Sequence, residues 1–346
     1  MPEFHSLTVE RVERLTDDAV VVTFLVPDQL KEKYRSLPGQ YITLKTTLNE
    51  VELRRSYSLC SAPASGVLSV GIKEVPGGKF SGFVNRSLRE GDQIDVGTPE
   101  GRFVFTEKEM NEPLMAIAAG SGITPIMSIL EAAFAQEKPA PFLLLYGNKT
   151  PEKTLFKSAL EALEAAYAPL LKIQWFYSEV NESNFSNGRI DSEKIGVAMD
   201  SFGSTPKKIY LCGPESLLTS SQSFLLEKGV SKEAIAFELF TASTEINEVE
   251  PQAEGGEIVL TCDEVQHTLE IQPGKTILDL ALQAKIDVPY SCQGGVCSSC
   301  IAKITHGKAT MLSNQILTDS EVNDGLVLTC QAIPESAHVE VDYDDV

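Results

Sequence analysis

Three cysteines lie close together in the stretch Pro289-Tyr290-Ser291-Cys292-Gln293-Gly294-Gly295-Val296-Cys297-Ser298-Ser299-Cys300, and Cys330 follows thirty residues later. The spacing C-x4-C-x2-C with a distant fourth cysteine is that of plant-type [2Fe–2S] sites. Gly294 and Gly295 allow positive φ values, so the loop backbone can approach a small inorganic cluster. We therefore predict that the cluster ligands are Cys292, Cys297, Cys300 and Cys330.

Two other uses of thiols fit this spacing less well. Structural zinc sites usually take cysteines in compact pairs, and here only Cys297 and Cys300 form one, which leaves zinc as the alternative. A disulfide framework is disfavoured in a long chain whose first residues lack the basic and apolar regions of a signal peptide. The remaining cysteines, Cys60, Cys212 and Cys262, imply no pairing.

Length and composition limit the function classes. A chain of 346 residues predicts two or three domains, and no apolar run approaches the roughly 20 residues that span a bilayer. The net charge of −20 disfavours binding to nucleic acid or to an anionic membrane, whereas a basic docking face on a protein partner is compatible with it. We expect a cytoplasmic protein with reduced thiols, and the oligomeric state stays open.

Residues 1–108 predict an antiparallel β-barrel or sandwich, because short β-rich runs at 7–9, 19–26, 40–44 and 66–72 alternate with glycine- and proline-containing turns. One polar segment in it is Arg54-Arg55-Ser56-Tyr57-Ser58-Leu59. On a strand, Arg55 and Tyr57 share one face and the two serines share the other. A guanidinium suits a diphosphate and an aromatic ring suits a flat cofactor ring.

The second polar segment is Gly77-Gly78-Lys79-Phe80-Ser81-Gly82, which precedes an expected short helix at 83–88. Backbone N–H groups at a helix N-terminus favour an anion, and Lys79 and Ser81 lie beside them. Taken alone, a Gly-Gly pair is most often an ordinary turn, and the Arg-Ser-Tyr-Ser run is an ordinary strand sequence.

Residues 109–240 predict a doubly wound α/β domain. Expected strands at 114–119, 142–146, 172–177, 207–211 and 236–240 alternate with helices at 126–134, 155–166 and 216–227. Two strand ends are rich in glycine, Gly120-Ser121-Gly122-Ile123-Thr124-Pro125 and Cys212-Gly213-Pro214, and ligands of such sheets bind at the carboxyl ends of strands. The full G-x-G-x-x-G fingerprint is missing, and Cys212 could be only a small buried side chain.

The last third of the chain divides into a linker and a compact domain. Residues 241–256 are acidic, lack periodicity and predict a flexible linker. Residues 257–346 predict a hairpin at 257–262 and 266–271, a helix at 277–284 and a strand at 327–330 that delivers Cys330.

Five motifs follow one another along the chain: Arg55-Ser56-Tyr57-Ser58, Gly78-Lys79-Phe80-Ser81, Gly120 to Pro125, Cys212-Gly213-Pro214 and the cysteine loop. Together they resemble the ferredoxin–NADP reductase superfamily with a C-terminal plant-type ferredoxin domain, over nearly the whole chain. The order looks most like oxygenase reductases, such as those of phenylacetyl-CoA epoxidase and 3-ketosteroid 9α-hydroxylase. The resemblance implies a flavin-binding β-barrel, a doubly wound α/β nucleotide domain and a β-grasp ferredoxin domain.

The resemblance also implies a flavin site. Arg55 would bind the flavin diphosphate, Tyr57 would pack on the isoalloxazine and Ser58 would lie near the flavin N5 atom. The turn before the first helix would hold the diphosphate, which favours FAD over FMN. The flavin set is Arg55, Ser56, Tyr57, Ser58, Lys73, Gly78, Lys79, Phe80, Ser81 and Phe240, with Lys73 near the adenosine half and Phe240 on the other flavin face.

A nicotinamide nucleotide site follows from the same resemblance. Its set is Gly120, Ser121, Gly122, Thr124, Pro125, Arg189, Cys212, Gly213 and Pro214. Many NADP-linked members carry a Ser-Arg pair after the third strand of this domain. Here Ser178 is followed by Glu179, which would repel a phosphate, whereas Arg189 could supply a guanidinium, so NADH and NADPH both stay open.

The implied function is an NAD(P)H-dependent iron–sulfur flavoprotein oxidoreductase. A hydride would pass from NAD(P)H to FAD, and single electrons would leave through the [2Fe–2S] cluster to an oxygenase or hydroxylase partner. Tyr57, Ser58 and Cys212 would lie beside the reacting atoms. The alternatives are a stand-alone reductase for a ferredoxin, haem or metal acceptor, and a non-catalytic protein that has kept the folds.

Overall fold

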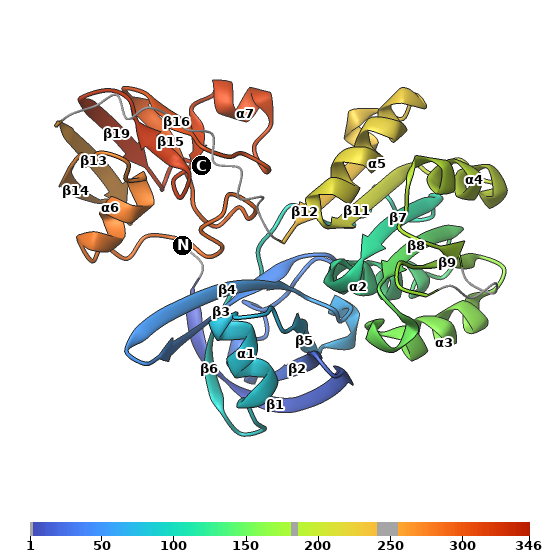
Figure 1. Ribbon diagram of the computed structural model, residues 1–346. Helices are drawn as coiled ribbons and strands as arrows, with labels where there is room; N and C mark the ends of the chain where they lie inside the picture. Colours follow the sequence, from blue (N-terminus) through green and yellow to red (C-terminus); the bar gives the residue numbers. More distant parts are fainter. Residues whose placement is uncertain (1–2, 181–185, 241–254) are drawn as a thin grey trace. The chain divides into compact units, whose positions relative to one another are not determined.

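The computed structural model describes residues 3–180, 186–240 and 255–346 (Figure 1). The linker predicted at 241–256 lies outside the described residues except for its last two positions. One compact unit spans 4–53 and 57–240, and a second contains 255–346. Within the described ranges, each helix is too short or too polar to cross a bilayer.

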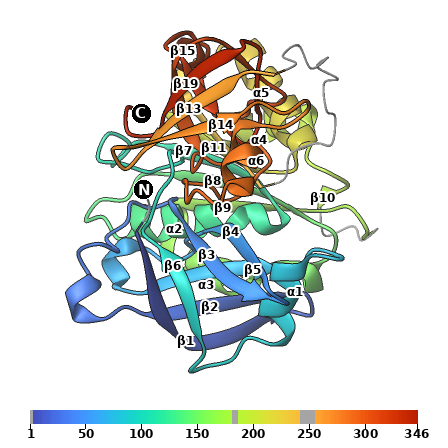
Figure 2. The same ribbon diagram turned by 90° about the vertical axis from the view of Figure 1, so that its left-hand side faces the viewer.

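Six antiparallel strands form the predicted barrel, in the order β4-β3-β6-β1-β2-β5 (Figure 2). A bridge between Leu59 and Val70 joins the end of β4 to β5, so the two edge strands meet and the sheet closes. The strands are β1 (Phe4–Thr16), β2 (Ala19–Leu25), β3 (Tyr41–Leu48), β4 (Val51–Ser58), β5 (Leu68–Lys73) and β6 (Gln93–Gly97).

The continuous apolar run of β2 has a structural reason. Val20, Val22 and Phe24 point into the barrel core, whereas Ala19 and Val21 on the opposite face pack with the nucleotide domain. Successive side chains of a strand face opposite ways, so a strand that is covered on both sides is apolar at most positions. The exception in β2 is the buried Thr23, whose hydroxyl shares a hydrogen bond with that of Ser69 (2.9 Å).

The helix that follows β5 begins earlier than predicted. It is α1 (Lys79–Arg86), with Gly78 as its N-cap, rather than a helix at 83–88. Phe80 and Val84 lie one turn apart and are both buried in the barrel core. This apolar pair places the first turn at Lys79, and the Gly-Gly turn hid that start in the sequence.

The second sheet is fully parallel, with the order β10-β9-β8-β7-β11-β12. Its helices α2 and α3 cover one face and α4 and α5 the other (Figure 1). The strands are β7 (Leu114–Ala119), β8 (Phe142–Asn148), β9 (Leu171–Tyr177), β10 (Ser186–Asn187), β11 (Lys208–Gly213) and β12 (Ile235–Leu239). The helices are α2 (Ile123–Phe134), α3 (Lys157–Tyr167), α4 (Ser192–Phe202) and α5 (Glu215–Glu227).

This arrangement confirms the doubly wound fold and corrects some of its details. The sequence did not predict α4 and β10, and α2 begins at Ile123 rather than at 126. The strand order reverses between β7 and β11, so a topological switch point lies between their carboxyl ends, where ligands of such sheets bind.

The barrel and the parallel sheet are packed directly together within the first unit. The Ser128 hydroxyl of α2 donates a hydrogen bond to the Ser61 carbonyl (2.7 Å), and the Ala62 N–H donates to the Glu131 carboxylate (2.9 Å). A Cβ atom on Gly71 of β5 would lie 2.6 Å from Thr124 Cγ2. Glycine at this position therefore lets β5 approach the N-terminus of α2.

The C-terminal unit has the expected β-grasp form. Its five-stranded sheet has the order β14-β13-β19-β15-β17, with β13 and β19 parallel, and α6 packs on it through Ile277, Leu280 and Ala281. The elements are β13 (Glu257–Cys262), β14 (Val265–Glu270), α6 (Ile277–Gln283), β15 (Ile301–His306), β16 (Ala309–Met311), α7 (Asp319–Asn323), β17 (Leu326–Leu328), β18 (Ala332–Pro334) and β19 (His338–Asp342).

Candidate functional site

The proposed flavin residues come from β4 and α1. The Tyr57 ring at the end of β4 lies 5.8 Å, between ring centroids, from the buried Phe80 ring of α1, so the strand and helix motifs are neighbours. Arg55 is exposed, and its Nη1 donates to the Arg54 carbonyl at 2.6 Å. Lys73, predicted near the adenosine half, lies with its Nζ 3.6 Å from Asp18 Oδ2.

The turn before α1 has a backbone that only glycine fits. Gly77 has φ +74°, and a Cβ on Gly78 would lie 2.5 Å from Ser81 Oγ and 3.0 Å from the Val75 carbonyl oxygen. Ser81 Oγ accepts the Val75 N–H at 3.1 Å, so this buried hydroxyl closes the turn. Lys79 is exposed at the first helical position, where the helix dipole favours an anion. The turn therefore fits a diphosphate.

The two glycine-rich strand ends touch through their backbones. A Cβ on Gly122 would lie 2.1 Å from the Cys212 carbonyl oxygen and 2.9 Å from the Gly213 nitrogen. Thr124 Oγ1 donates to the Ser121 carbonyl (3.0 Å), and the Tyr146 hydroxyl donates to the Gly120 carbonyl (3.0 Å). Pro125 is buried within α2, and Pro214 directly precedes α5. The structure thus brings the two glycine-rich motifs together at the switch point of the sheet, whereas Arg189 lies beyond the edge strand β10.

This contact gives a first prediction. Gly122→Ala should force β7 and β11 apart, lower stability by roughly 1–3 kcal/mol and weaken binding of the nicotinamide nucleotide. Gly196→Ala in α4 is the matched control, because its Cβ would meet only the Phe224 ring edge at 3.3 Å. The measurements are the thermal midpoint and the NADPH-induced change in flavin absorbance. Equal behaviour of the two variants would contradict this account.

A buried carboxyl group joins the barrel to the nucleotide sheet. Ser58 Oγ donates to Glu238 Oε2 at 2.9 Å, and Glu238 pairs in register with Cys212 on the adjacent strand. Burial raises the pKa of Glu238 to about 7, although the hydrogen bond from Ser58 lowers it. Burial, together with the charge of Glu238, raises the pKa of the Cys212 thiol well above its usual range, so that thiol stays neutral. Phe240 follows β12 and is 37% exposed.

Charged side chains stand at the carboxyl ends of β8, β9 and β10. Lys149 Nζ lies 3.0 Å from Glu179 Oε1, so a cation neutralises the carboxylate that was expected to repel a phosphate. Arg189 is exposed just beyond β10, and its carbonyl accepts a hydrogen bond from Lys194 Nζ at 2.6 Å. This edge therefore presents an exposed guanidinium at Arg189, while the Glu179 carboxylate is paired with Lys149.

The four predicted cluster ligands converge in the C-terminal unit. Cys292 is within hydrogen-bonding reach of Cys297 and Cys330, and Cys300 is within reach of Cys330. These neighbouring thiols lower the pKa of Cys292, and the backbone N–H of Gly294, 3.4 Å from its Sγ, adds to the effect.

The backbone of the cysteine loop accords with the sequence except in two respects. Gly295 has φ +71°, as expected, but the positive φ expected at Gly294 occurs at Gln293 instead (φ +56°). Cys330 lies two residues beyond β17, rather than on a strand as predicted. Three of the four thiols are buried and Cys292 is partly exposed, so the loop encloses a set of soft sulfur ligands. This arrangement fits a [2Fe–2S] cluster.

Comparisons with known proteins show which cofactors the chain binds and which family it belongs to. Three family models match in order: an oxidoreductase FAD-binding domain over residues 6–105, an oxidoreductase NAD-binding domain over 116–223 and a 2Fe-2S iron-sulfur cluster binding domain over 251–335. One of the subunits of 1,2-phenylacetyl-CoA epoxidase from Escherichia coli K12 is 37% identical, with 99% of each chain covered. The chain belongs to the ferredoxin–NADP reductase superfamily. It is an NAD(P)H-dependent iron–sulfur flavoprotein oxidoreductase whose cofactors are FAD, a nicotinamide nucleotide and a [2Fe–2S] cluster.

Other relatives of this reductase agree. The ferredoxin reductase component of 3-ketosteroid-9-alpha-monooxygenase from Mycobacterium tuberculosis H37Rv is 31% identical, covering 98% of this chain and 96% of its own. The structure of phthalate dioxygenase reductase has the same fold, with a TM-score of 0.63, 23% identity and 98% of both chains covered. The 2Fe-2S domain match over the cysteine loop selects the cluster over the zinc alternative.

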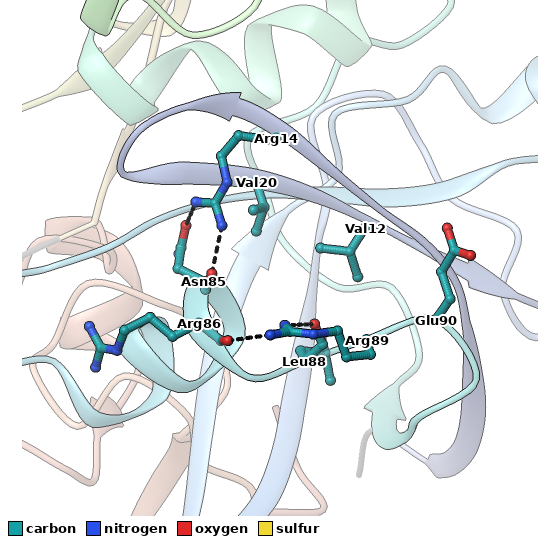
Figure 3. A pocket seen from close by; sticks show the side chains of 8 residues that line it. All are labelled: Val12, Arg14, Val20, Asn85, Arg86, Leu88, Arg89 and Glu90. Carbon is teal, nitrogen blue, oxygen red and sulfur yellow. Dashed lines mark hydrogen bonds between the residues drawn. The ribbon is translucent and has the colours of Figure 1, made fainter.

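Two arginines bind the C-terminal end of α1 in the reductase, beside a hollow of about 470 Å³ (Figure 3). The Arg14 guanidinium donates to Asn85 Oδ1 (3.2 Å) and to the Asn85 carbonyl (2.7 Å). Arg89 donates to the carbonyls of Leu88 (2.8 Å) and Arg86 (2.7 Å). Cations at a helix C-terminus satisfy its last carbonyls and complement its dipole. The lining is Val12, Arg14, Val20, Asn85, Arg86, Leu88, Arg89 and Glu90, with no member of the predicted flavin set.

Thr329 ties the last cysteine to the cysteine loop of the reductase. Its N–H and its hydroxyl both donate to the Cys300 carbonyl at 3.0 Å, and the Tyr343 hydroxyl donates to its Oγ1 at 2.8 Å. Thr329 is fully buried, so every one of these groups is away from water.

A second prediction follows from Thr329. Thr329→Val keeps the shape but leaves the buried Tyr343 hydroxyl without its acceptor, so the C-terminal unit should lose about 1–3 kcal/mol of stability. The cluster should then be released at a lower temperature, which loss of its visible absorbance reports. Thr268→Val on β14 is the control, because Thr268 is exposed. Unchanged cluster release in Thr329→Val would contradict the role given to this residue.

Two residues of the site escaped prediction from the sequence. Glu238 is a lone carboxylate in the apolar run of β12, and that break in the pattern was the available signal. Thr329 carries no signal in the sequence, because its hydrogen bonds to Cys300, Tyr343 and the Leu278 N–H (3.1 Å) exist only in the folded unit.

Proposed function

We propose that this reductase supplies electrons to a terminal oxygenase or hydroxylase, since relatives of it are named as reductase components of monooxygenases. The observation that carries the proposal is the hydrogen bond between Ser58 and Glu238. It joins the end of the flavin-barrel strand β4 to the carboxyl end of the nucleotide-sheet strand β12. This contact supports a flavin site and a nucleotide site that adjoin at one buried point.

The site residues have distinct roles in this proposal. The turn at Gly78 to Ser81 and the exposed Lys79 hold the flavin diphosphate, with Arg55 on β4. Tyr57 and Phe240 would pack against the flavin ring, and Ser58 would lie near its N5 atom. The contact between Gly122 and Cys212 shapes the backbone that receives the nicotinamide nucleotide.

When bound, FAD and the [2Fe–2S] cluster would supply the redox chemistry, namely hydride uptake from NAD(P)H and the onward transfer of single electrons. The protein holds a proton for this chemistry at Glu238, whose pKa of about 7 allows it to bind or release one at neutral pH. Cys212 excludes water from the same point as a neutral, buried thiol.

We place the functional boundaries at 1–108 for flavin binding, 109–240 for nucleotide binding and 257–346 for the cluster, with a linker at 241–256. A cytoplasmic location accords with reduced thiols at the cluster. The cluster domain is the outlet toward the partner protein.

Anaerobic titration of the purified holoprotein with NADH, and separately with NADPH, tests the proposal. We expect the flavin band to bleach first and the cluster band to follow, and the preferred nucleotide to act at lower concentration. Arg189→Ala should weaken the response to NADPH more than that to NADH if the guanidinium binds the 2′-phosphate. A protein in which neither nucleotide bleaches the flavin would refute the proposed function.

A further inference from the structure

Gln331, the residue after the last cysteine, reaches back over the cysteine loop. Its amide nitrogen Nε2 donates to the Gln293 carbonyl at 3.2 Å and to the Cys330 carbonyl at 2.9 Å. The same nitrogen lies 3.7 Å from the Cys330 Sγ, within the range of an N–H···S hydrogen bond. The side chain therefore touches both segments that supply the cluster ligands.

The packing of Gly295 fixes this orientation. A Cβ on Gly295 would lie 2.9 Å from Gln331 Cγ and 3.2 Å from the Ser313 carbonyl oxygen, so the Gln331 stem lies directly on the loop backbone. The amide orientation is fixed as well. Two carbonyl oxygens face the terminal atom, and the amide oxygen at that position would meet two acceptors.

Hydrogen bonds to ligand sulfurs stabilise the more negative, reduced form of an iron–sulfur cluster and raise its reduction potential. Donors to the ligand sulfurs include the Gly294 N–H, 3.4 Å from Cys292 Sγ, and the Gln331 amide beside Cys330. Gln331 acts through a side chain, and that side chain is uncharged. It therefore can tune the potential without adding net charge at the outlet.

We propose that Gln331 is a positioning residue that raises the reduction potential of the [2Fe–2S] cluster by donating an N–H to Cys330 Sγ. The inference rests on the proposed function, because it presupposes the cluster. The Gln331 amide has two N–H groups for three acceptors. One donates to the Gln293 carbonyl, and the other is shared between the Cys330 carbonyl and the Cys330 Sγ as a bifurcated bond.

Gln331→Met tests the proposal in the full-length holoprotein. Methionine keeps the length and the packing over Gly295 but has no donor. We expect a lower midpoint potential in a redox titration followed by electron paramagnetic resonance. A tenfold change in the reduction equilibrium is 59 mV for a one-electron couple, and we expect a shift of about that size. Gln266→Met on the exposed strand β14 is the matched control and should leave the potential unchanged.

Gln331→Glu is the second variant, with the shape of glutamine and a negative charge in place of the donor. We expect a downward shift at least as large as that of Gln331→Met, and this variant decides the matter if the methionine protein does not retain its cluster. A cluster-loaded variant with the wild-type potential overturns the proposal, even if it loses iron faster. Bleaching of the flavin by NAD(P)H should persist in both variants, so its absence would bear on the proposed function instead.

Discussion

The Cys297→Ser protein should no longer pass electrons to its protein acceptor, while NAD(P)H still reduces its flavin. Cys297 is buried among the other three thiols, in the unit that contains residues 255–346. A serine hydroxyl is a hard, protonated ligand and does not replace a thiolate on iron. Replacing a residue that only hydrogen-bonds to a metal ligand already costs about 10–100-fold in metal affinity or activity. We therefore expect acceptor reduction to fall by at least about 100-fold.

Stopped-flow absorbance separates the two halves of this prediction. Flavin bleaching should keep its wild-type rate, because the residues proposed to hold the flavin and the nucleotide belong to other segments of the chain. Cys262→Ser is the matched control: Cys262 is also a buried cysteine of the C-terminal unit, at the end of β13, and lies outside the cluster motif. Loss of flavin reduction in Cys297→Ser, or equal loss of acceptor reduction in Cys262→Ser, would contradict the proposed order of transfer.

The features that sequence predicted best are those that depend on neighbours along the chain. The spacing of Cys292, Cys297 and Cys300 is a local geometric requirement, and it identified the cluster loop correctly. The apolar runs that became β7 and β8 are complete within a few residues, so their strand character was visible. Alternation of such runs with helices was enough for the doubly wound fold.

The features that could not be predicted from the sequence depend on contacts with residues far away in the chain. The pKa of Glu238 reflects burial and a hydrogen bond from Ser58, which lies 180 positions earlier. The start of α1 is set by Phe80 fitting into the barrel core, which a Gly-Gly turn conceals. Nothing in the sequence distinguishes Gln331 from a surface glutamine, because its contact with Gly295 of the cysteine loop exists only in the folded protein. Tertiary contacts, rather than local propensity, determine each of these.

Glu238→Gln should remove a pH dependence from both stability and flavin reduction. The pKa of Glu238 is raised from 4.5 to about 7 in the folded protein, so the folded state binds this proton more tightly than the unfolded state does. The contribution of Glu238 to stability is then fully present below about pH 4.5, falls as the pH rises toward 7 and is lost above it. The difference between these two pKa values corresponds to about 3 kcal/mol.

Glutamine does not titrate, but its side-chain oxygen can still accept the hydrogen bond from Ser58. The Glu238→Gln protein should therefore show a flatter stability profile between pH 5 and 8 and should exceed the wild type above pH 7. Denaturant unfolding of the holoprotein, followed by release of flavin fluorescence, measures this. Glu227→Gln, an exposed glutamate at the end of α5, is the control and should follow the wild-type profile. Parallel profiles for wild type and Glu238→Gln would show that this carboxyl group is not protonated at neutral pH. Because the same proton is proposed to serve the flavin, the pH dependence of flavin reduction near pH 7 should disappear in the same variant.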